Sequence, residues 1–315
     1  MRPGEGKIVG DEKTQTTASE GTALRRQLID HLRVRGYSKS TIKVYVDWVI
    51  RLASFYNRSP DLLSEQELLQ FVSHLHDKEL SCSSINVGVS ALIYLYGKVL
   101  ERPVEDLRKC LPRSRTPVRM PRAYSIEEVN ALLEAARRIR LHYTLLSTVY
   151  HCGLRLSEVC TLRFSAVQRT SNRLLVVEGK GKKDRYTLLP TRLQQELVDY
   201  YYNYRARYGR KVDWMFVRPR RPSESFCPGT LHRIFHRTRK RAGLPHIGGI
   251  HILRHSFASH HLMAGMDLMR LKYVLGHGNL KSTMRYFHLV QSSAAYDPSI
   301  SPLDRSWPDQ SAPQD

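Results

Sequence analysis

The stretch from His251 to Leu289 most constrains what this chain can fold into and do. It is HILRHSFASHHLMAGMDLMRLKYVLGHGNLKSTMRYFHL. His251 and Arg254 are three residues apart, a spacing that puts both on one face of a helix. His277 and Tyr286 follow in the same run. Arginine binds phosphate oxygens through two nitrogens, histidine transfers protons or donates hydrogen bonds, and tyrosine can be a nucleophile. The combination predicts phosphate chemistry.

Short helices are expected to bring these side chains together. Glycines 265 and 276 predict the ends of two helices, Ile252–Ala264 and Asp267–Leu275. Apolar residues at helical spacing give the second helix a buried face. His277 then follows a helix end, and Asn279 can cap a third helix that carries Tyr286.

Two upstream motifs add cationic groups. GLRLSE at Gly153–Glu158 places Arg155 at the start of a helix, where it can face an anion or simply pair with Glu158. GKGKKDR at Gly179–Arg185 lies between two predicted strands, 174–178 and 185–190. A lysine at such a hairpin tip can extend into a groove, although solvated tips of this kind are common.

These motifs occur in the order and spacing of a known family. His277 lies 23 residues after Arg254, and Tyr286 lies nine residues after His277. Over roughly residues 21–290 the chain resembles the tyrosine site-specific recombinases, the phage integrase family, and their Xer-like members. The resemblance implies a mainly α fold with a small β-sheet. A four-helix, SAM-like core-binding domain would precede an α+β DNA breaking–rejoining catalytic domain. The catalytic residues it implies are Arg155, Lys180, His251, Arg254, His277 and Tyr286.

The residue types define a mechanism for such a site. Tyr286 would attack the scissile phosphate and form a 3′-phosphotyrosine bond, while Arg155 and Arg254 neutralise the non-bridging oxygens. His251 would accept the tyrosine proton, His277 would donate to a phosphate oxygen, and Lys180 would protonate the leaving 5′-oxygen. No metal, ATP or other cofactor is needed. By resemblance, a homotetramer exchanges strands between two paired DNA sites through a Holliday junction, in a mobile-element or integrase role.

Composition agrees with a DNA partner. The 315 residues carry a net charge of +21, and a basic chain of this kind is typical of proteins that bind nucleic acid. No run approaches the roughly 18 apolar residues of a membrane helix, and the N-terminus lacks the apolar core of a secretory signal. The five cysteines show no CxxC pair, which indicates reduced thiols. We therefore expect a cytoplasmic, nucleoid-associated protein with no membrane partner.

Segment composition predicts the domain organisation. Residues 1–20 are polar and are expected to be disordered; 21–107 hold four amphipathic helices that form the core-binding domain. Residues 108–122 contain six basic residues, three prolines and no acid, so they are expected to form an extended basic linker. The resemblance implies that residues 123–290 form the catalytic domain, and 291–315 are expected to form a tail. The first domain could instead bind a protein, and the linker could be plain solvated chain. The tail could be disordered or could dock on a neighbouring protomer.

Several basic residues are candidate DNA contacts. They lie in the linker, at the hairpin tip and on a predicted helix at 230–242. They are Arg113, Arg115, Arg119, Lys182, Lys183, Arg233, Arg237, Arg239, Lys240 and Arg241. A tyrosine-rich helix at 200–208 is expected to pack, with its arginines extending to solvent.

Three alternatives remain open at this point. His251 and His255 are four residues apart, as in some zinc sites, but no HExxH motif or cysteine cluster accompanies them. His255, His260 and His261 are expected to be structural or surface residues. The chain could also relax DNA as a type IB topoisomerase, or could be a non-catalytic DNA-binding regulator.

Overall fold

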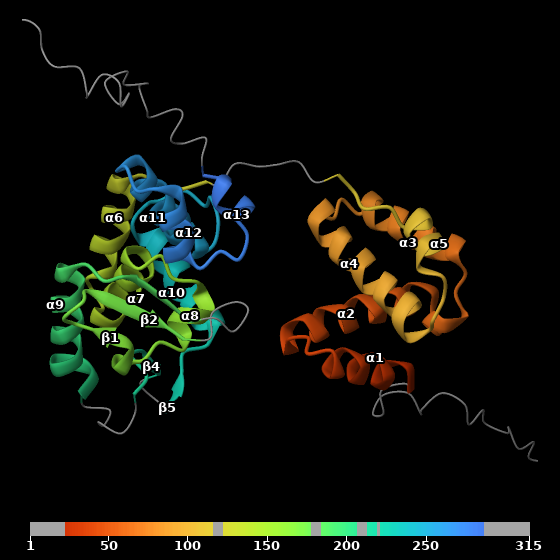
Figure 1. Cartoon of the computed structure of the whole chain (residues 1–315), viewed down its shortest axis with the longest axis horizontal. Coiled ribbons are helices and arrows are strands. Elements are labelled where there is room, and N and C mark those ends of the chain that lie inside the picture. The colour runs from red at the N-terminus through yellow and green to blue at the C-terminus, as the bar shows by residue number, and fades with distance from the viewer. Residues whose placement is uncertain (1–22, 116–121, 178–183, 207–212, 219–220, 287–315) are drawn as a thin grey trace, which may run out of the picture. The chain divides into compact units, whose positions relative to one another are not determined.

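The computed structural model describes residues 23–115, 122–177, 184–206, 213–218 and 221–286. The chain divides into two compact units, Met1–Val118 and Arg119–Asp315 (Figure 1). Both units are mainly helical, and small sheets occur only in the second among the described residues, so the predicted fold class is confirmed. None of the described helices is long and apolar enough to cross a membrane. The five cysteines are free thiols.

The N-terminal unit is a helical bundle built on the predicted amphipathic segments. Its helices are α1 (Ala23–Val34), α2 (Lys39–Tyr56), η1 (Pro60–Leu62), α3 (Glu65–Asp77), α4 (Cys82–Tyr94), η2 (Leu95–Val99) and α5 (Val104–Cys110). Serines begin three of them, since the side chains of Ser38, Ser64 and Ser81 each accept a backbone N–H of the first turn. Ser64 forms a capping box with Glu67.

Helix α5 corrects the start predicted for the linker. Arg108 and Lys109 were expected in extended chain, but they lie in α5. Leu107 and Leu111 are almost fully buried in the core of the N-terminal unit, and this burial stabilises a fifth helix up to Cys110. Linker residues 116–121 lie outside the described part of the chain.

The C-terminal unit combines helices with two small antiparallel sheets. Its helices are α6 (Ile126–Ala136), α7 (Arg140–His151), α8 (Leu156–Cys160), η3 (Phe164–Ala166), α9 (Thr191–Tyr200), η4 (Tyr201–Arg205), α10 (Pro228–Arg241), α11 (His251–Met263), α12 (Leu268–Leu275) and α13 (Lys281–Met284). Its strands are β1 (Val167–Gln168), β2 (Arg173–Val176), β3 (Arg185–Leu188), β4 (Val217–Arg218) and β5 (Arg221–Ser225).

The first sheet has the order β1-β2-β3, and its β2–β3 pair is the predicted hairpin. Strand alternation places Arg185 and Thr187 on the buried face, opposite Val176 and Leu174. Strands β1, β4 and β5 were not predicted. They are short, and β5 is polar, so the alternation that marks a strand is missing from their sequence.

The tyrosine-rich segment is packed as expected, but one of its arginines differs from the prediction. Tyr200 is fully buried, and the α-helix continues as the π-helix η4. Arg205 does not extend to solvent: it is fully buried and donates its Nε to the Trp214 carbonyl at 2.9 Å. Tyr208 lies outside the described residues.

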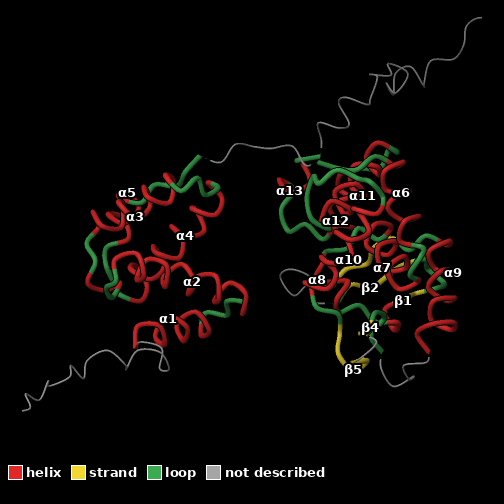
Figure 2. Tube along the Cα trace, turned by 180° about the vertical axis from the view of Figure 1, so that it is seen from behind, coloured by secondary structure: helices red, strands yellow, loops and turns green. Residues whose placement is uncertain are grey.

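The elements with the candidate catalytic motifs lie together. Helix α11 packs against α6, α7 and α12, and α12 packs against β3. Both views of the chain show α11 and α12 side by side, with α13 following α12 (Figures 1 and 2). Residues far apart in sequence can therefore meet at one end of α12.

Candidate active site

Helix α11 presents its candidate residues in two different environments. His251 begins the helix and is exposed, whereas Arg254 faces inward and is 4% exposed. The predicted three-residue spacing holds, but the two side chains differ in burial. Partial desolvation lowers the pKa of His251, and the neighbouring cation of Arg254 lowers it further. His251 is therefore neutral at pH 7 and able to accept a proton.

Arg254 is held by two backbone carbonyls. Its Nη1 donates to Gly153 at 2.7 Å and its Nη2 donates to Leu275 at 2.5 Å. Burial and the charge of Arg155 lower its pKa to about 9, which still leaves the guanidinium charged at pH 7. Gly153 is required at this close approach, because its φ is +58° and a Cβ would lie 2.6 Å from the Phe257 ring.

Arg155 precedes α8 and makes the pair with Glu158 that the sequence offered as one alternative, together with a backbone contact that was not expected. Its Nη1 donates to Glu158 Oε1 at 2.8 Å, so the local ion pair exists. Its Nη2 donates to the Gly276 carbonyl at 2.8 Å, which places it at the end of α12. The backbone N–H of Arg155 also donates to Glu158 Oε2 at 2.7 Å. Glu158 thus links the start of α8 to the site.

Glu158 is a buried carboxylate among three arginines. It is 6% exposed, and burial alone would raise its pKa. The hydrogen bonds and charge of Arg185, together with the hydrogen bonds from Arg155, outweigh burial and lower the pKa to about 2. Arg254 Nη1 lies 3.8 Å from Glu158 Oε2. Glu158 is therefore ionised, and it neutralises part of a strongly positive site.

Arg185 was missed as a site residue by the sequence analysis. It is 6% exposed and donates Nη1 and Nη2 to the two oxygens of Glu158, both at 2.8 Å. Its Nε donates to the Val274 carbonyl at 2.9 Å. The only sequence signal was its position, as the first residue of a predicted strand directly after the glycine- and lysine-rich hairpin tip.

The C-terminal end of α12 is where the three arginines meet. The consecutive carbonyls of Val274, Leu275 and Gly276 accept from Arg185, Arg254 and Arg155 respectively. The last carbonyls of a helix lack intrahelical partners and carry partial negative charge, so they suit guanidinium donors. Gly276 has a φ of +63°, and a Cβ there would lie 2.5 Å from Arg185 Cδ.

His277 directly follows this helix end, as predicted. Its Nδ1 lies 2.8 Å from the hydroxyl oxygen of Thr283, a buried residue of α13. Burial lowers its pKa to about 4, with further lowering by Arg254 and Arg155. The imidazole is therefore neutral at pH 7.

Tyr286 is 3% exposed and packs in an apolar cluster of α11 and α12 residues. It was expected within a third helix, but α13 ends at Met284 and Tyr286 lies in the turn that follows. Asn279 does bind near the start of that helix, since its Oδ1 accepts the Lys281 N–H at 2.9 Å. The helix is shorter than expected because Tyr286 turns its ring into the core, with its N–H bonded to the Thr283 carbonyl.

His255 contacts the Tyr286 hydroxyl, a role that the sequence analysis did not assign to it. Its Nδ1 lies 2.5 Å from the hydroxyl oxygen. Burial lowers the pKa of His255 to about 4, and burial also raises the pKa of Tyr286. The other two histidines are structural: His260 bonds the Tyr150 hydroxyl, and His261 bonds the Phe257 carbonyl. No group of three or more potential metal ligands occurs in the described part of the chain.

The candidate DNA contacts differ in how they are presented. Arg233, Arg237, Lys240 and Arg241 of α10 are exposed. Arg239 is half-buried and donates its Nη1 to the Leu244 carbonyl at 2.8 Å, just beyond the helix end. Arg113 and Arg115 are exposed. Four predicted residues lie outside the described part of the chain: Arg119, Lys180, Lys182 and Lys183.

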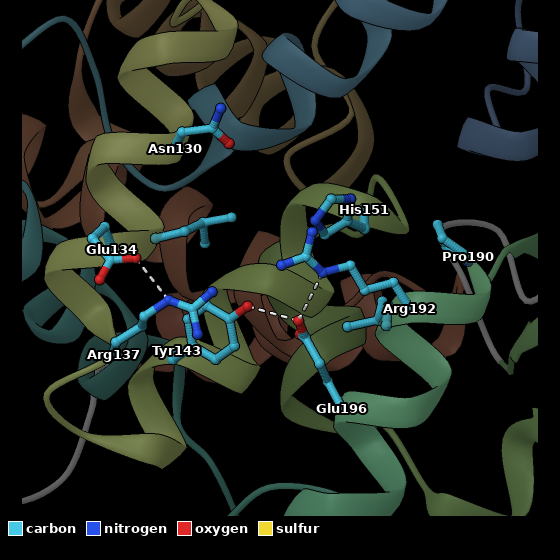
Figure 3. A pocket seen from close by; sticks show the side chains of 10 residues that line it. Asn130, Glu134, Arg137, Tyr143, His151, Pro190, Arg192 and Glu196 are labelled. Atoms are coloured by element: carbon cyan, nitrogen blue, oxygen red, sulfur yellow. Dashed lines mark hydrogen bonds and ion pairs between the residues drawn. The ribbon is translucent and has the colours of Figure 1, made fainter.

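A polar pocket of about 260 Å³ lies elsewhere on the C-terminal unit, between α6, α7 and α9 (Figure 3). Arg137, Arg192 and Glu196 line it, and the Glu196 carboxylate accepts from the Tyr143 hydroxyl at 2.7 Å. None of the candidate catalytic residues that the structure describes lines this pocket. The arginine cluster at the end of α12 is thus a separate site.

Comparison with known proteins decides the family. Residues 124–292 match the phage integrase family, and residues 24–106 match the phage integrase N-terminal SAM-like domain. The chain belongs to the phage integrase family. It is a tyrosine recombinase by family, and both of its units correspond to domains of that family.

One relative and two solved structures show the extent of the likeness. The tyrosine recombinase XerA of Pyrococcus furiosus is 32% identical, over 81% of this chain and 86% of its own length. A crystal structure of XerA recombinase is 27% identical, with a TM-score of 0.50, over 86% of this chain and 94% of that one. XerH bound to a palindromic difH substrate is 19% identical, with a TM-score of 0.67, over 88% and 84%. This last likeness shows the fold alone.

Proposed function

We propose that this tyrosine recombinase cuts and rejoins double-stranded DNA at a specific site with Tyr286 as nucleophile. The observation that carries the proposal is the convergence of Arg155 and Arg254 on adjacent carbonyls at the end of α12. His277 is the next residue, and the same unit buries Tyr286. Two guanidinium groups beside a tyrosine and neutral histidines suit phosphoryl transfer without a metal.

In the proposed cleavage step the tyrosine oxygen forms a bond to phosphorus, and the bond from phosphorus to the 5′-oxygen breaks. Arg155 and Arg254 neutralise the charge that builds on the non-bridging oxygens. His251 accepts the tyrosine proton, and Lys180 protonates the leaving 5′-oxygen. A 5′-hydroxyl of another strand then attacks the phosphotyrosine, reverses these bond changes and restores the tyrosine. The ester conserves the bond energy, so ATP is not required.

The tyrosine has to move before it reacts. Its hydroxyl contacts His255 in a buried setting, and burial raises its pKa, which disfavours the phenolate. We therefore propose that DNA binding moves Tyr286 away from His255 and toward the arginines. His251, which is exposed at the start of α11, can then accept its proton.

The proposed assembly and biological role rest on the net charge of the chain and on a structural relative that was solved with DNA. A net charge of +21 favours a nucleic-acid partner, and the structurally similar XerH was solved bound to its difH substrate. We propose four protomers on two paired sites, in a cytoplasmic, mobile-element or integrase role. Residues 291–315 lie outside the described part of the chain, and we propose that they contribute to assembly.

Covalent trapping tests the function and finds the site at the same time. The protein is incubated with fragmented DNA of its host, denatured and recovered, and the attached DNA is sequenced. We expect a recurring core sequence, and a nicked suicide substrate built from it should accumulate the adduct. Tyr286→Phe should fold and bind DNA but form no adduct.

Three outcomes would contradict the proposal. Adducts of the Tyr286→Phe variant would place the nucleophile elsewhere, with the exposed Tyr273 of α12 as a rival. Relaxation of any plasmid without recombinant products would indicate a topoisomerase. Absence of any adduct with the wild-type protein, despite tight DNA binding, would favour a non-catalytic regulator.

A further inference from the structure

Arg185 is a buried charge that the proposed mechanism leaves unused. It lies on strand β3, and the alternation of that strand turns it inward. Its three hydrogen bonds go to two different elements: two to Glu158 of α8, and one to the carbonyl of Val274 of α12. These elements adjoin both candidate catalytic arginines.

We propose that Arg185 is a positioning residue, which sets Arg155 and Arg254 through Glu158 and through the end of α12. This inference rests on the proposed function, because it concerns the same phosphate site. Arg185 itself is 6% exposed and does not need to contact DNA.

Charge explains why Glu158 needs this partner. Glu158 accepts the Arg155 guanidinium on Oε1 and the Arg155 backbone N–H on Oε2, and Oε2 also lies 3.8 Å from Arg254 Nη1. Arg185 occupies both oxygens with charge-assisted bonds, so the carboxylate is largely satisfied by a residue outside the phosphate site. Without Arg185, this desolvated carboxylate would draw Arg155 and Arg254 toward itself and away from a phosphate.

Geometry explains why the residue is an arginine. A guanidinium offers a planar fork for both carboxylate oxygens and a third N–H for the Val274 carbonyl. A lysine ammonium is a single nitrogen and cannot reach all three acceptors. Gly276 leaves the required space, since a Cβ there would lie 2.5 Å from Arg185 Cδ.

The test uses two forms of the core site recovered by covalent trapping. One form has a normal scissile phosphate, and the other has a methylphosphonate, in which a methyl group replaces a charged non-bridging oxygen. The catalytic arginines neutralise that charge, so Arg155→Ala should lose much less rate on the methylphosphonate. Arg185→Met should lose about 10²-fold in cleavage rate on the normal phosphate, as small misplacements of catalytic groups do. On the methylphosphonate most of this loss should disappear, with DNA affinity changed less than about threefold on both.

A matched control separates positioning from a general loss of stability. Arg205 is another fully buried arginine, on η4, which holds none of the catalytic candidates. Arg205→Met should lower Tm while changing the two cleavage rates by the same factor. An equal loss by Arg185→Met on both substrates would overturn the inference. If Arg185→Met does not fold, Arg185→Lys, which keeps the buried charge and stem, undergoes the same comparison.

A double-mutant cycle tests the route through Glu158. If Arg185 acts through the carboxylate, Arg185→Met should cost much less in the Glu158→Gln background than in the wild type. Fully multiplicative losses would contradict that route. Failure of the function itself has a different signature, because then the wild-type protein traps no DNA and no core site is recovered.

Discussion

At the scale of single residues, the proposed nucleophile contacts a histidine other than the proposed base. The Tyr286 hydroxyl contacts His255, whereas the candidate base His251 is exposed at the start of α11. Both histidines have lowered pKa values, so both are neutral at pH 7. Substitution can distinguish the roles of His251 and His255, because only His251 is proposed to accept the tyrosine proton.

The first prediction compares His251 with His255. His251→Gln should lower the cleavage rate by about 10²–10⁴-fold, the usual cost of removing a positioned base. His255→Gln keeps a hydrogen-bonding group beside Tyr286 and should lose less than about tenfold. Single-turnover cleavage of the suicide substrate measures both. The reverse ranking would assign the base to His255.

The second prediction concerns Lys180 as the general acid. Lys180→Ala should bind DNA and cleave about 10²–10⁴-fold more slowly, and Lys182→Ala should be much milder. Replacing the bridging 5′-oxygen with sulfur gives a leaving thiolate whose conjugate acid has a pKa of about 8.5 and needs no proton. Sulfur should therefore restore cleavage by Lys180→Ala and do little for Arg155→Ala. Equal rescue of both variants would refute the assignment, and rescue of Lys182→Ala instead would move the acid to Lys182.

At the scale of elements, helix α10 shows how a basic segment divides between two tasks. Arg233, Arg237 and Lys240 recur at spacings of four and three and are exposed, so they share a face. Arg239 is half-buried and binds the Leu244 carbonyl, which ties the loop to the helix end. Only the exposed set is suited to a phosphate backbone.

The third prediction uses this division. Neutralising Arg233, Arg237 and Lys240 with glutamine should weaken binding to all DNA sequences. The salt slope, which is the slope of the logarithm of the binding constant against the logarithm of the salt concentration, should flatten by about 0.9 for each phosphate that is no longer neutralised. Arg239→Gln should instead lower the free energy of unfolding by about 1–2 kcal/mol and leave the slope unchanged. Binding titrations at several salt concentrations, with thermal melts, compare the two. A flattened salt slope for Arg239→Gln would contradict this division and indicate that Arg239 contacts DNA.

The fourth prediction concerns how stability depends on pH through two histidines, His255 on α11 and His277 directly after α12. The folded protein lowers the pKa of His255 and of His277 from 6.5 to about 4. Between these values the unfolded chain binds more protons than the folded one, so stability rises with pH there. We therefore expect Tm to fall as pH drops from about 6.5 to 4. The His255→Gln/His277→Gln variant should show a flatter Tm profile across that window, and an unchanged profile would contradict the assignment.

At the scale of the whole molecule, net positive charge is expected to dominate the affinity for DNA. A net +21 distributed over two units predicts strongly salt-dependent DNA binding, because each phosphate contact releases counterions. Arg113 and Arg115, at the end of the N-terminal unit, are exposed and available for such contacts.

The fifth prediction therefore addresses the segment between the units. Replacing Arg113, Arg115 and Arg119 with glutamine should weaken binding for all sequences and flatten the salt slope. The matched control replaces Arg25, Arg26 and Arg33 of α1, which makes the same change in net charge. A smaller effect of the control would support a direct contact by the linker. Equal effects would mean that net charge alone is responsible.

Local patterns in the sequence were enough for much of the fold. Helical spacing and glycine stops depend on neighbours within one turn, and they predicted α11 and α12 closely. The family resemblance named Arg155, His251, Arg254, His277 and Tyr286 as candidates. It could do so because their spacing along the chain is itself the signature.

Tertiary structure alone decided which partner each of these side chains has. Arg185 contacts the candidate site because β3 turns it inward. Its partners are Glu158, 27 positions earlier in the chain, and Val274 of α12, 89 positions later. Tyr286 contacts His255 because the turn after α13 directs its ring into the core. Arg239 donates to the Leu244 carbonyl because the loop after α10 folds back on that helix. Periodicity reports which face of an element is buried. It carries no information on which distant carbonyl or carboxylate lies on the other side of that face, because the packing of separate elements determines that contact.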